Sequence, residues 1–133
     1  MTNAKLKRLI VTEDMGPFRA TGLAPALRSL REILSAVRRE QPDLHGALGT
    51  AGMLCCRYQR KSRTAISNHS WGTAIDLTIN GVLDAPGNGR VQLGLSLLAP
   101  YFNKAGWYWG AAFGREDGMH FEVGPQLLGT FAV

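Results

Sequence analysis

The stretch of the chain that decides the fold is Ser67-Asn-His-Ser-Trp-Gly-Thr-Ala-Ile-Asp76. It places His69 and Asp76 seven residues apart, with Gly72 between them. From residue 74 to residue 79 apolar side chains recur at every second position, which predicts a strand with one buried face and Asp76 on the other face. The following Asn80-Gly81 is typical of a tight hairpin turn.

A second stretch, Asp117-Gly-Met-His-Phe-Glu122, places an acid three residues before His120. Residues 119–123 again alternate between apolar and polar side chains, which predicts a second strand. We expect both strands to turn their polar sides outward, away from the packed side of the sheet.

Two segments have the apolar spacing of helices. Residues 25–40 carry apolar side chains at helical intervals with arginines opposite, and residues 92–105 suggest a second helix that Pro100 bends or interrupts. Residues 44–54 hold a short helix or loop, which leads to a candidate strand at 53–56.

The chain has 133 residues, which fit one domain spanning 1–133. Within it, residues 1–20 are expected to form a short strand or a loosely ordered arm, because Gly16-Pro17 is a turn signal. We expect a monomer.

The formal net charge of +5 favours anionic partners such as nucleic acid, anionic lipid or acidic cell-wall polymers. The basic residues are spread over residues 5–8, 38–39 and 57–63 instead of forming one long run. This distribution argues against a domain that only binds nucleic acid.

The two cysteines, Cys55 and Cys56, are adjacent, and neighbouring residues rarely meet the geometry of a disulfide. A buried apolar role for them is favoured over a role as thiolate ligands. The apolar run at residues 9–11 is too short for a signal peptide, and the sequence contains no transmembrane span. We therefore expect synthesis in the cytoplasm without a signal peptide.

The histidines and acids of the two stretches suggest a metal site. A catalytic zinc site has three nitrogen or oxygen ligands and leaves a fourth position for water. His69, Asp76 and His120 are the right types in the right number. Because His69 and Asp76 are an odd number of residues apart, both can face one metal only if the chain turns between them, and Gly72 permits that turn.

Hydrolysis at such a site also needs a group that takes a proton from water and later donates one. Asp117, three residues before His120, can approach the same water from a tight loop. Glu116 is the competing candidate.

Other side chains are open to two interpretations. Arg57 and Arg63 can bind a substrate carboxylate or can simply be solvated loop arginines. Trp107 and Trp109 can line a substrate groove or belong to the core. His45 lacks the acidic context of the other two histidines, so we assign it no functional role.

The motif Ser-x-His-x-x-Gly-x-Ala-x-Asp at residues 67–76, followed by Asp-x-x-His-Phe-Glu at residues 117–122, resembles the zinc peptidases of the bacterial cell wall. These include D-alanyl-D-alanine carboxypeptidases, vancomycin-resistance D,D-dipeptidases and phage L-alanyl-D-glutamate endopeptidases. The resemblance covers residues 54–123. It implies a small α+β domain, related to the hedgehog signalling domain, in which an antiparallel sheet carries one zinc ion and helices flank it.

Carried over to this sequence, the resemblance implies that His69, Asp76 and His120 bind zinc and that Asp117 is the general base. It also implies that Arg57 and Ser67 contact the substrate. The carboxypeptidase and dipeptidase branches usually have glutamate at the position of Asp117, whereas the endolysin-like endopeptidases commonly have aspartate.

The expected function is therefore hydrolysis of peptidoglycan stem peptides by a phage or prophage L-alanyl-D-glutamate endopeptidase that acts on the wall after release or export. The alternative enzyme is a D-alanyl-D-alanine carboxypeptidase. The alternative from another class is a zinc-containing binding domain without catalysis. Neither a nucleic-acid partner nor membrane insertion is expected.

Overall fold

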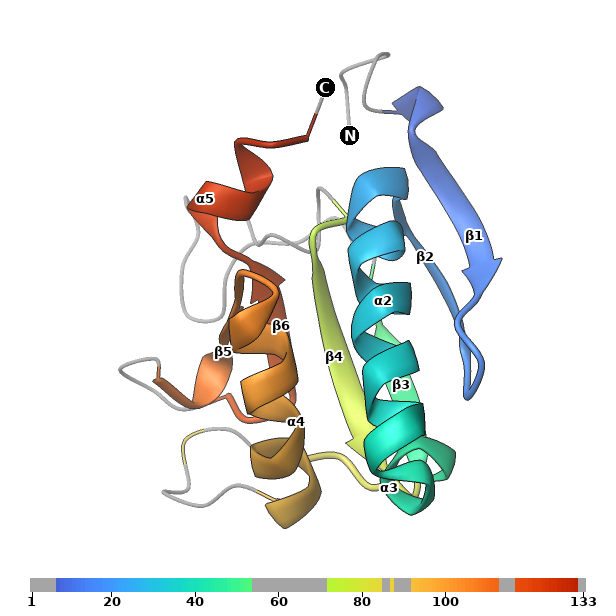
Figure 1. The fold of residues 1–133 in the computed structure, drawn as a ribbon, viewed down its shortest axis with the longest axis vertical. Helices are drawn as coiled ribbons and strands as arrows, with labels where there is room; N and C mark the ends of the chain where they lie inside the picture. The colour runs from blue at the N-terminus through green and yellow to red at the C-terminus, as the bar shows by residue number, and fades with distance from the viewer. Residues whose placement is uncertain (1–6, 54–71, 85–86, 88–91, 113–116, 132–133) are drawn as a thin grey trace.

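The structure is a computed structural model that describes residues 7–53, 72–84, 87, 92–112 and 117–131. These residues form one four-stranded sheet, one two-stranded hairpin and several helices, which is the expected α+β class (Figure 1). In the described part of the chain, no helix has both the length and the apolar character needed to cross a membrane.

The four-stranded sheet has the order β3-β4-β6-β5, and every neighbouring pair is antiparallel. Its central strands are β4, Ala74–Ile79, and β6, His120–Val123, and its outer strands are β3, Leu48–Gly52, and β5, Trp107–Trp109. The strands expected at 74–79 and 119–123 are thus confirmed, and the sheet places them side by side. The two motif stretches meet because β4 and β6 pair directly.

The turn after β4 also follows the prediction. Asn80 and Gly81 both have positive φ angles, of 52° and 74°, as a two-residue hairpin turn of type I′ requires. Val82 then forms a bridge back to Ile79.

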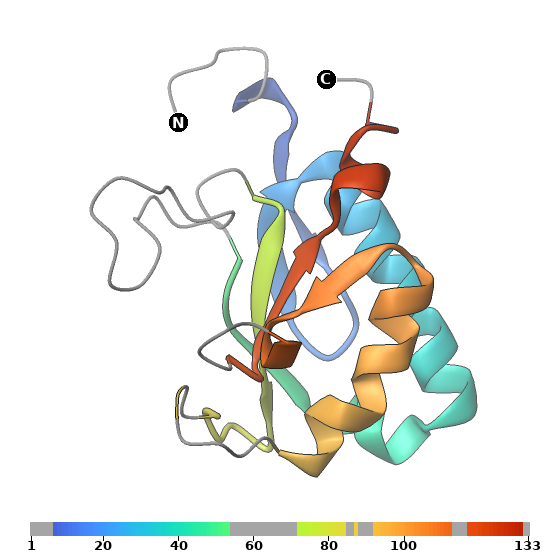
Figure 2. The ribbon, with the colours of Figure 1, turned by 90° about the vertical axis from the view of Figure 1, so that its left-hand side faces the viewer.

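The two expected helices are present as α2, Ala24–Glu40, and α4, Leu93–Lys104. Figures 1 and 2 show both helices on the same side of the four-stranded sheet. Pro100 lies inside α4 and does not end the helix. The helices cover the apolar face of the sheet, where the Phe102 ring stacks on Phe121 with their centroids 4.2 Å apart.

The burial of this core stabilises the strands that carry the motif residues. Its fully buried large side chains come from both helices, from the hairpin and from the apolar face of the sheet: Leu23, Leu27, Leu30, Leu34, Ile75, Leu77, Leu95, Leu98, Phe102, Trp107 and Phe121. Each such side chain contributes roughly 1.5–3 kcal/mol through removal from water.

Near the N-terminus, β1, Ile10–Asp14, pairs with β2, Arg19–Leu23, in an antiparallel hairpin around Gly16-Pro17. The short helix α3, Pro42–Gly46, follows α2. A strand then begins at Leu48, five residues before the candidate strand at 53–56, whose residues 54–56 lie outside the described residues. The glycines of this segment lower its strand propensity, but pairing with β4 overrides that local preference.

The C-terminal part adds two short elements. The 3-10 helix η2, Gly110–Ala112, follows β5 directly, and the helix α5, Pro125–Leu128, follows β6. The first of these elements lies against the turn that precedes His120, because the amide of Asp117 donates to the carbonyl of Gly110 at 2.9 Å.

Candidate metal centre

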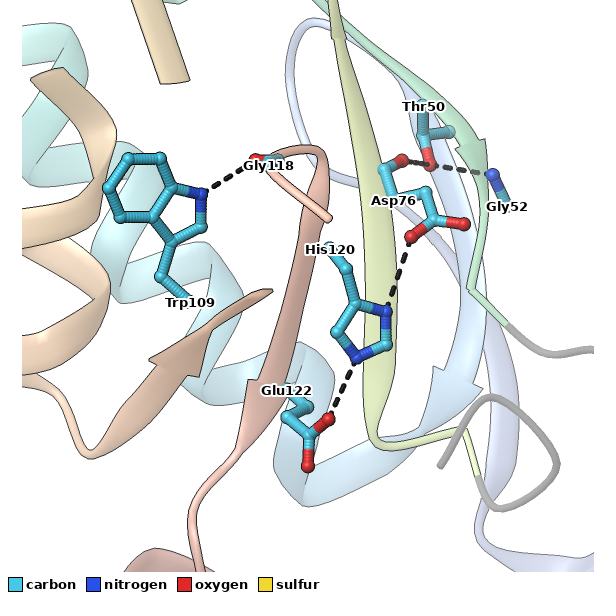
Figure 3. A network of polar contacts seen from close by, with 7 residues as sticks. All are labelled: Thr50, Gly52, Asp76, Trp109, Gly118, His120 and Glu122. Atoms are coloured by element: carbon cyan, nitrogen blue, oxygen red, sulfur yellow. Dashed lines mark hydrogen bonds and ion pairs between the residues drawn. The ribbon is translucent and has the colours of Figure 1, made fainter. Parts of the chain in front are cut away.

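Asp76 and His120 form the centre of the site. They are directly opposite each other in the register of β4 and β6, so their side chains leave the same face of the sheet. Nδ1 of His120 lies 3.3 Å from Oδ1 of Asp76 (Figure 3). Pairing of two strands distant in the sequence therefore brings a carboxylate and an imidazole into contact.

Asp117 joins this pair from the turn before β6. The turn is tight, since the amide of His120 donates to the carbonyl of Asp117 at 3.0 Å. Asp117, Asp76 and His120 each offer one metal-ligating atom, and these three atoms lie within 4.8 Å of one another. The structure thus brings together three of the residues that the sequence singled out.

The indole of Trp109 helps to hold this turn. Its Nε1 donates to the carbonyl of Gly118 at 2.6 Å, next to Asp117 (Figure 3). Trp107, in contrast, is buried in the core and donates from Nε1 to Oγ of Ser29 at 3.0 Å. Of the two alternatives considered for Trp107, the core role is therefore correct.

Gly110 is a site residue that the sequence analysis missed. A Cβ atom at this position would lie only 2.2 Å from the carbonyl oxygen of Asp117 and 3.0 Å from Cβ of His120. Only glycine permits this approach between the end of β5 and the turn. The available signal was the position of Gly110 directly after the aromatic strand segment.

Gly72 makes the turn that the sequence predicted, with a φ of +71°. It has a second role, because its carbonyl accepts a hydrogen bond from the amide of Leu23 at 3.0 Å, and a Cβ atom would lie 2.7 Å from that amide nitrogen. The chain entering β4 is thereby held against the β1–β2 hairpin.

The backbone of Asp76 is held from the other side by β3. The hydroxyl of Thr50 donates to the carbonyl of Asp76 at 2.8 Å and accepts from the amide of Gly52 at 3.0 Å (Figure 3). The register of β3 on β4 shifts at this point, as in a β-bulge. Such irregularities commonly lie next to functional sites.

The polar side chains of both strands lie on the face opposite the apolar one, as expected, but the expectation that only one face is buried is wrong. Asp76 and His120 are only 4% and 6% exposed, and Thr78 is buried as well. Strand alternation predicts which side chains share a face, but it does not predict whether that second face is solvated. Charged groups are buried where they are paired or bind a metal, and Asp76 and His120 are paired.

Glu122 contacts the far side of the same imidazole. Its Oε1 lies 2.8 Å from Nε2 of His120, so the ring lies between two carboxylates (Figure 3). The alternation of residues 119–123 predicted that Glu122 lies on the polar face of the strand, but it pointed to no role for this residue. The available signal was the two-residue spacing, which puts Glu122 and His120 on one face of a strand.

These contacts change the proton affinity of His120 in the metal-free protein. Burial of the ring lowers its pKa, but the hydrogen bonds and negative charges of Asp76 and Glu122 act in the opposite direction and raise the pKa to about 9. A metal ion that binds His120 near neutral pH must therefore displace a proton.

The donor set of the cluster suits a divalent metal ion. Two carboxylates and one imidazole are oxygen and nitrogen ligands of the kinds that zinc accepts. A cation would also offset the mutual repulsion of the two neighbouring acids. Other expected participants, namely His69, Arg57, Ser67, Glu116, Arg63, Cys55 and Cys56, lie outside the described residues.

Fold and site together define a small α+β domain with a candidate metal centre on its two central strands. Residues 60–123 match the family model described as D-alanyl-D-alanine carboxypeptidase. Over this segment, which contains the cluster and Glu122, the chain is similar to this peptidase family. A comparison with curated proteins finds no match.

Proposed function

We propose that the protein is a zinc-dependent peptidase that hydrolyses the stem peptides of peptidoglycan. The observation that carries this proposal is the meeting of Asp76, Asp117 and His120 within 4.8 Å, inside the segment that matches the peptidase family. The family supplies the type of reaction, and the cluster supplies residues able to perform it.

In the proposed site, His69, Asp76 and His120 hold the zinc ion and Asp117 is the general base. Asp76 and His120 are buried and are held by the paired strands, as suits residues that stay in place during a reaction. Asp117 is only partly buried and lies on a turn, where it can reach both the cluster and incoming water. The competing assignment makes Asp117 a metal ligand.

A bound zinc ion would supply a Lewis acid for the scissile carbonyl and a water molecule of lowered pKa. Asp117 would accept a proton from the water that attacks the scissile carbonyl and would donate a proton to the leaving amine. Arg57 and Ser67 are proposed to orient the substrate, Arg57 through a carboxylate of the peptide.

The bond that we propose is the one between L-alanine and D-glutamate, and the proposed origin is a phage or prophage. Aspartate instead of glutamate at position 117 supports this choice within the resemblance described above. The runner-up is removal of the terminal D-alanine, the activity named by the family description. The net charge of +5 suits an acidic wall polymer, which the enzyme would reach after release or export.

Digestion of purified peptidoglycan tests the proposal. Peptidoglycan from walls of several chemotypes is incubated with three zinc-loaded proteins: wild type, Asp117→Ala and the control Asp43→Ala. The acid removed in the control is exposed on α3. Mass spectrometry of new L-alanine carboxyl termini would identify the endopeptidase, and released D-alanine the carboxypeptidase. The control should cleave like wild type and Asp117→Ala should not.

One result would count against this function, and another against the role proposed for Asp117. Absence of cleavage by zinc-loaded wild type on every wall would contradict the enzyme and leave a zinc-containing binding domain. If Asp117→Ala binds no zinc, Asp117 is a ligand and the base must be sought elsewhere.

A further inference from the structure

We infer that Glu122 is a positioning residue: it holds the imidazole of His120 in the one tautomer and orientation that directs the Nδ1 lone pair at the metal centre. This inference rests on the proposed function, since it concerns the same centre. Glu122 itself is not one of the three clustered ligand residues.

The first step is the placement of the two ring nitrogens. Nδ1 of His120 faces Oδ1 of Asp76 at 3.3 Å, on the side of the cluster. Nε2 points the opposite way and lies 2.8 Å from Oε1 of Glu122, as Figure 3 shows. The two nitrogens therefore have separate partners on opposite sides of the ring.

The second step is the chemistry of a neutral imidazole, the form that binds a metal. One ring nitrogen carries a proton and the other carries a lone pair. A hydrogen-bond acceptor next to one nitrogen fixes the proton on that nitrogen and so determines the tautomer. An ionised carboxylate only accepts hydrogen bonds, so Glu122 requires the proton on Nε2. The lone pair is then left on Nδ1, facing Asp76.

The third step is the rigidity of the support. Glu122 is in the middle of the sheet, with Ala74 of β4 opposite it on one side and Tyr108 of β5 on the other. Its side chain is 22% exposed, so its carboxylate is partly shielded from competing water. Because its backbone is paired on both sides, Glu122 can hold the ring of His120 in a fixed orientation.

The test compares Glu122→Ala and Glu122→Gln with wild type and with the control Glu40→Ala, an exposed glutamate at the end of α2. Zinc affinity is measured by competition with a chromophoric chelator, and the tautomer of His120 by nitrogen-15 NMR of the zinc-loaded proteins. Loss of an outer partner of a histidine ligand typically weakens metal binding about 10–100-fold.

We expect zinc affinity to fall by this factor in Glu122→Ala and to be unchanged in the control. The fall should be smaller in Glu122→Gln, because its amide oxygen can still accept a hydrogen bond from Nε2. The NMR signals should show a protonated Nε2 in wild type and lose that preference in Glu122→Ala. If Glu122→Ala does not fold, as judged by its thermal unfolding, the glutamine variant alone decides: a measurable loss of zinc affinity with Nε2 still protonated supports the inference, and unchanged affinity with a changed tautomer overturns it. Wild-type affinity and tautomer in Glu122→Ala overturn the inference alone, whereas a wild type that takes up no zinc overturns the proposed function with it.

Discussion

Asp76 of β4 and His120 of β6 are register partners at the centre of the sheet, with Oδ1 and Nδ1 3.3 Å apart. Their contact depends on the pairing of two strands far apart in the sequence. The register also determines the site, because a shift by one residue would send one of the two side chains into the apolar core.

Replacing Asp76 by asparagine keeps the shape of the side chain and removes its charge. We expect zinc affinity to fall by more than the roughly 10–100-fold that loss of an outer partner costs. The metal-free variant should also lose about 1–3 kcal/mol of stability, because the buried imidazolium of His120 loses an ionised partner. Zinc titration and urea unfolding in a chelator measure the two effects, and native values for both would contradict the assignment of Asp76.

The raised pKa of His120 makes the metal-free protein sensitive to pH. Between the ordinary value of 6.5 and the folded value of about 9, the folded protein binds more protons than the unfolded chain. The contribution of this residue to the free energy of unfolding is on the order of 3 kcal/mol. It is fully present below pH 6.5 and is lost as the pH rises to about 9. Urea unfolding with chelator at pH 6, 7.5 and 9 measures this loss, and His120→Ala should lack it.

The same proton opposes metal binding. Because zinc must displace it, the apparent zinc affinity should rise by about tenfold per pH unit from neutrality toward pH 9. Competition titrations over this range test the prediction. An affinity independent of pH would mean that His120 is not a ligand.

Gly110→Ala places a methyl group against the carbonyl of Asp117, where the Cβ distance would be 2.2 Å. The turn must shift, so we expect a loss of about 1–3 kcal/mol in stability and a reduced rate of cleavage. Gly46→Ala is the matched control, since its Cβ would meet no atom within 4 Å. Equal stability of the two variants would show that the contact with the turn is not tight.

Trp109→Phe removes the hydrogen bond to the carbonyl of Gly118 and keeps an aromatic ring beside Phe121. If this bond positions Asp117, kcat should fall roughly tenfold, or about 1.4 kcal/mol, while zinc affinity stays the same. Steady-state kinetics on a stem peptide measure kcat, and the zinc content measured in parallel shows whether metal binding has changed. A loss of zinc without a specific loss in kcat would point to Asp117 as a ligand.

The sequence predicted the elements whose signals are local. Alternating residues in 74–79 predicted β4, apolar spacing predicted α2, and Asn80-Gly81 predicted the hairpin turn. It also singled out Asp76 and His120, an acid and a histidine on polar strand faces, and Asp117, an acid three residues before His120.

Features that depend on tertiary contact could not be predicted in this way. β3 is rich in glycine and forms because β4 offers it a partner, and the burial of Asp76 depends on what covers the second face of the sheet. Gly110 and Glu122 matter through neighbours that only the folded chain provides.

The most direct test of the metal centre is X-ray diffraction from crystals of the zinc-loaded protein at energies on both sides of the zinc absorption edge. We expect one anomalous peak per chain, at about 2.0–2.2 Å from a carboxylate oxygen of Asp76 and from Nδ1 of His120. A peak elsewhere on the chain, or no peak in protein that has been saturated with zinc, would contradict this expectation.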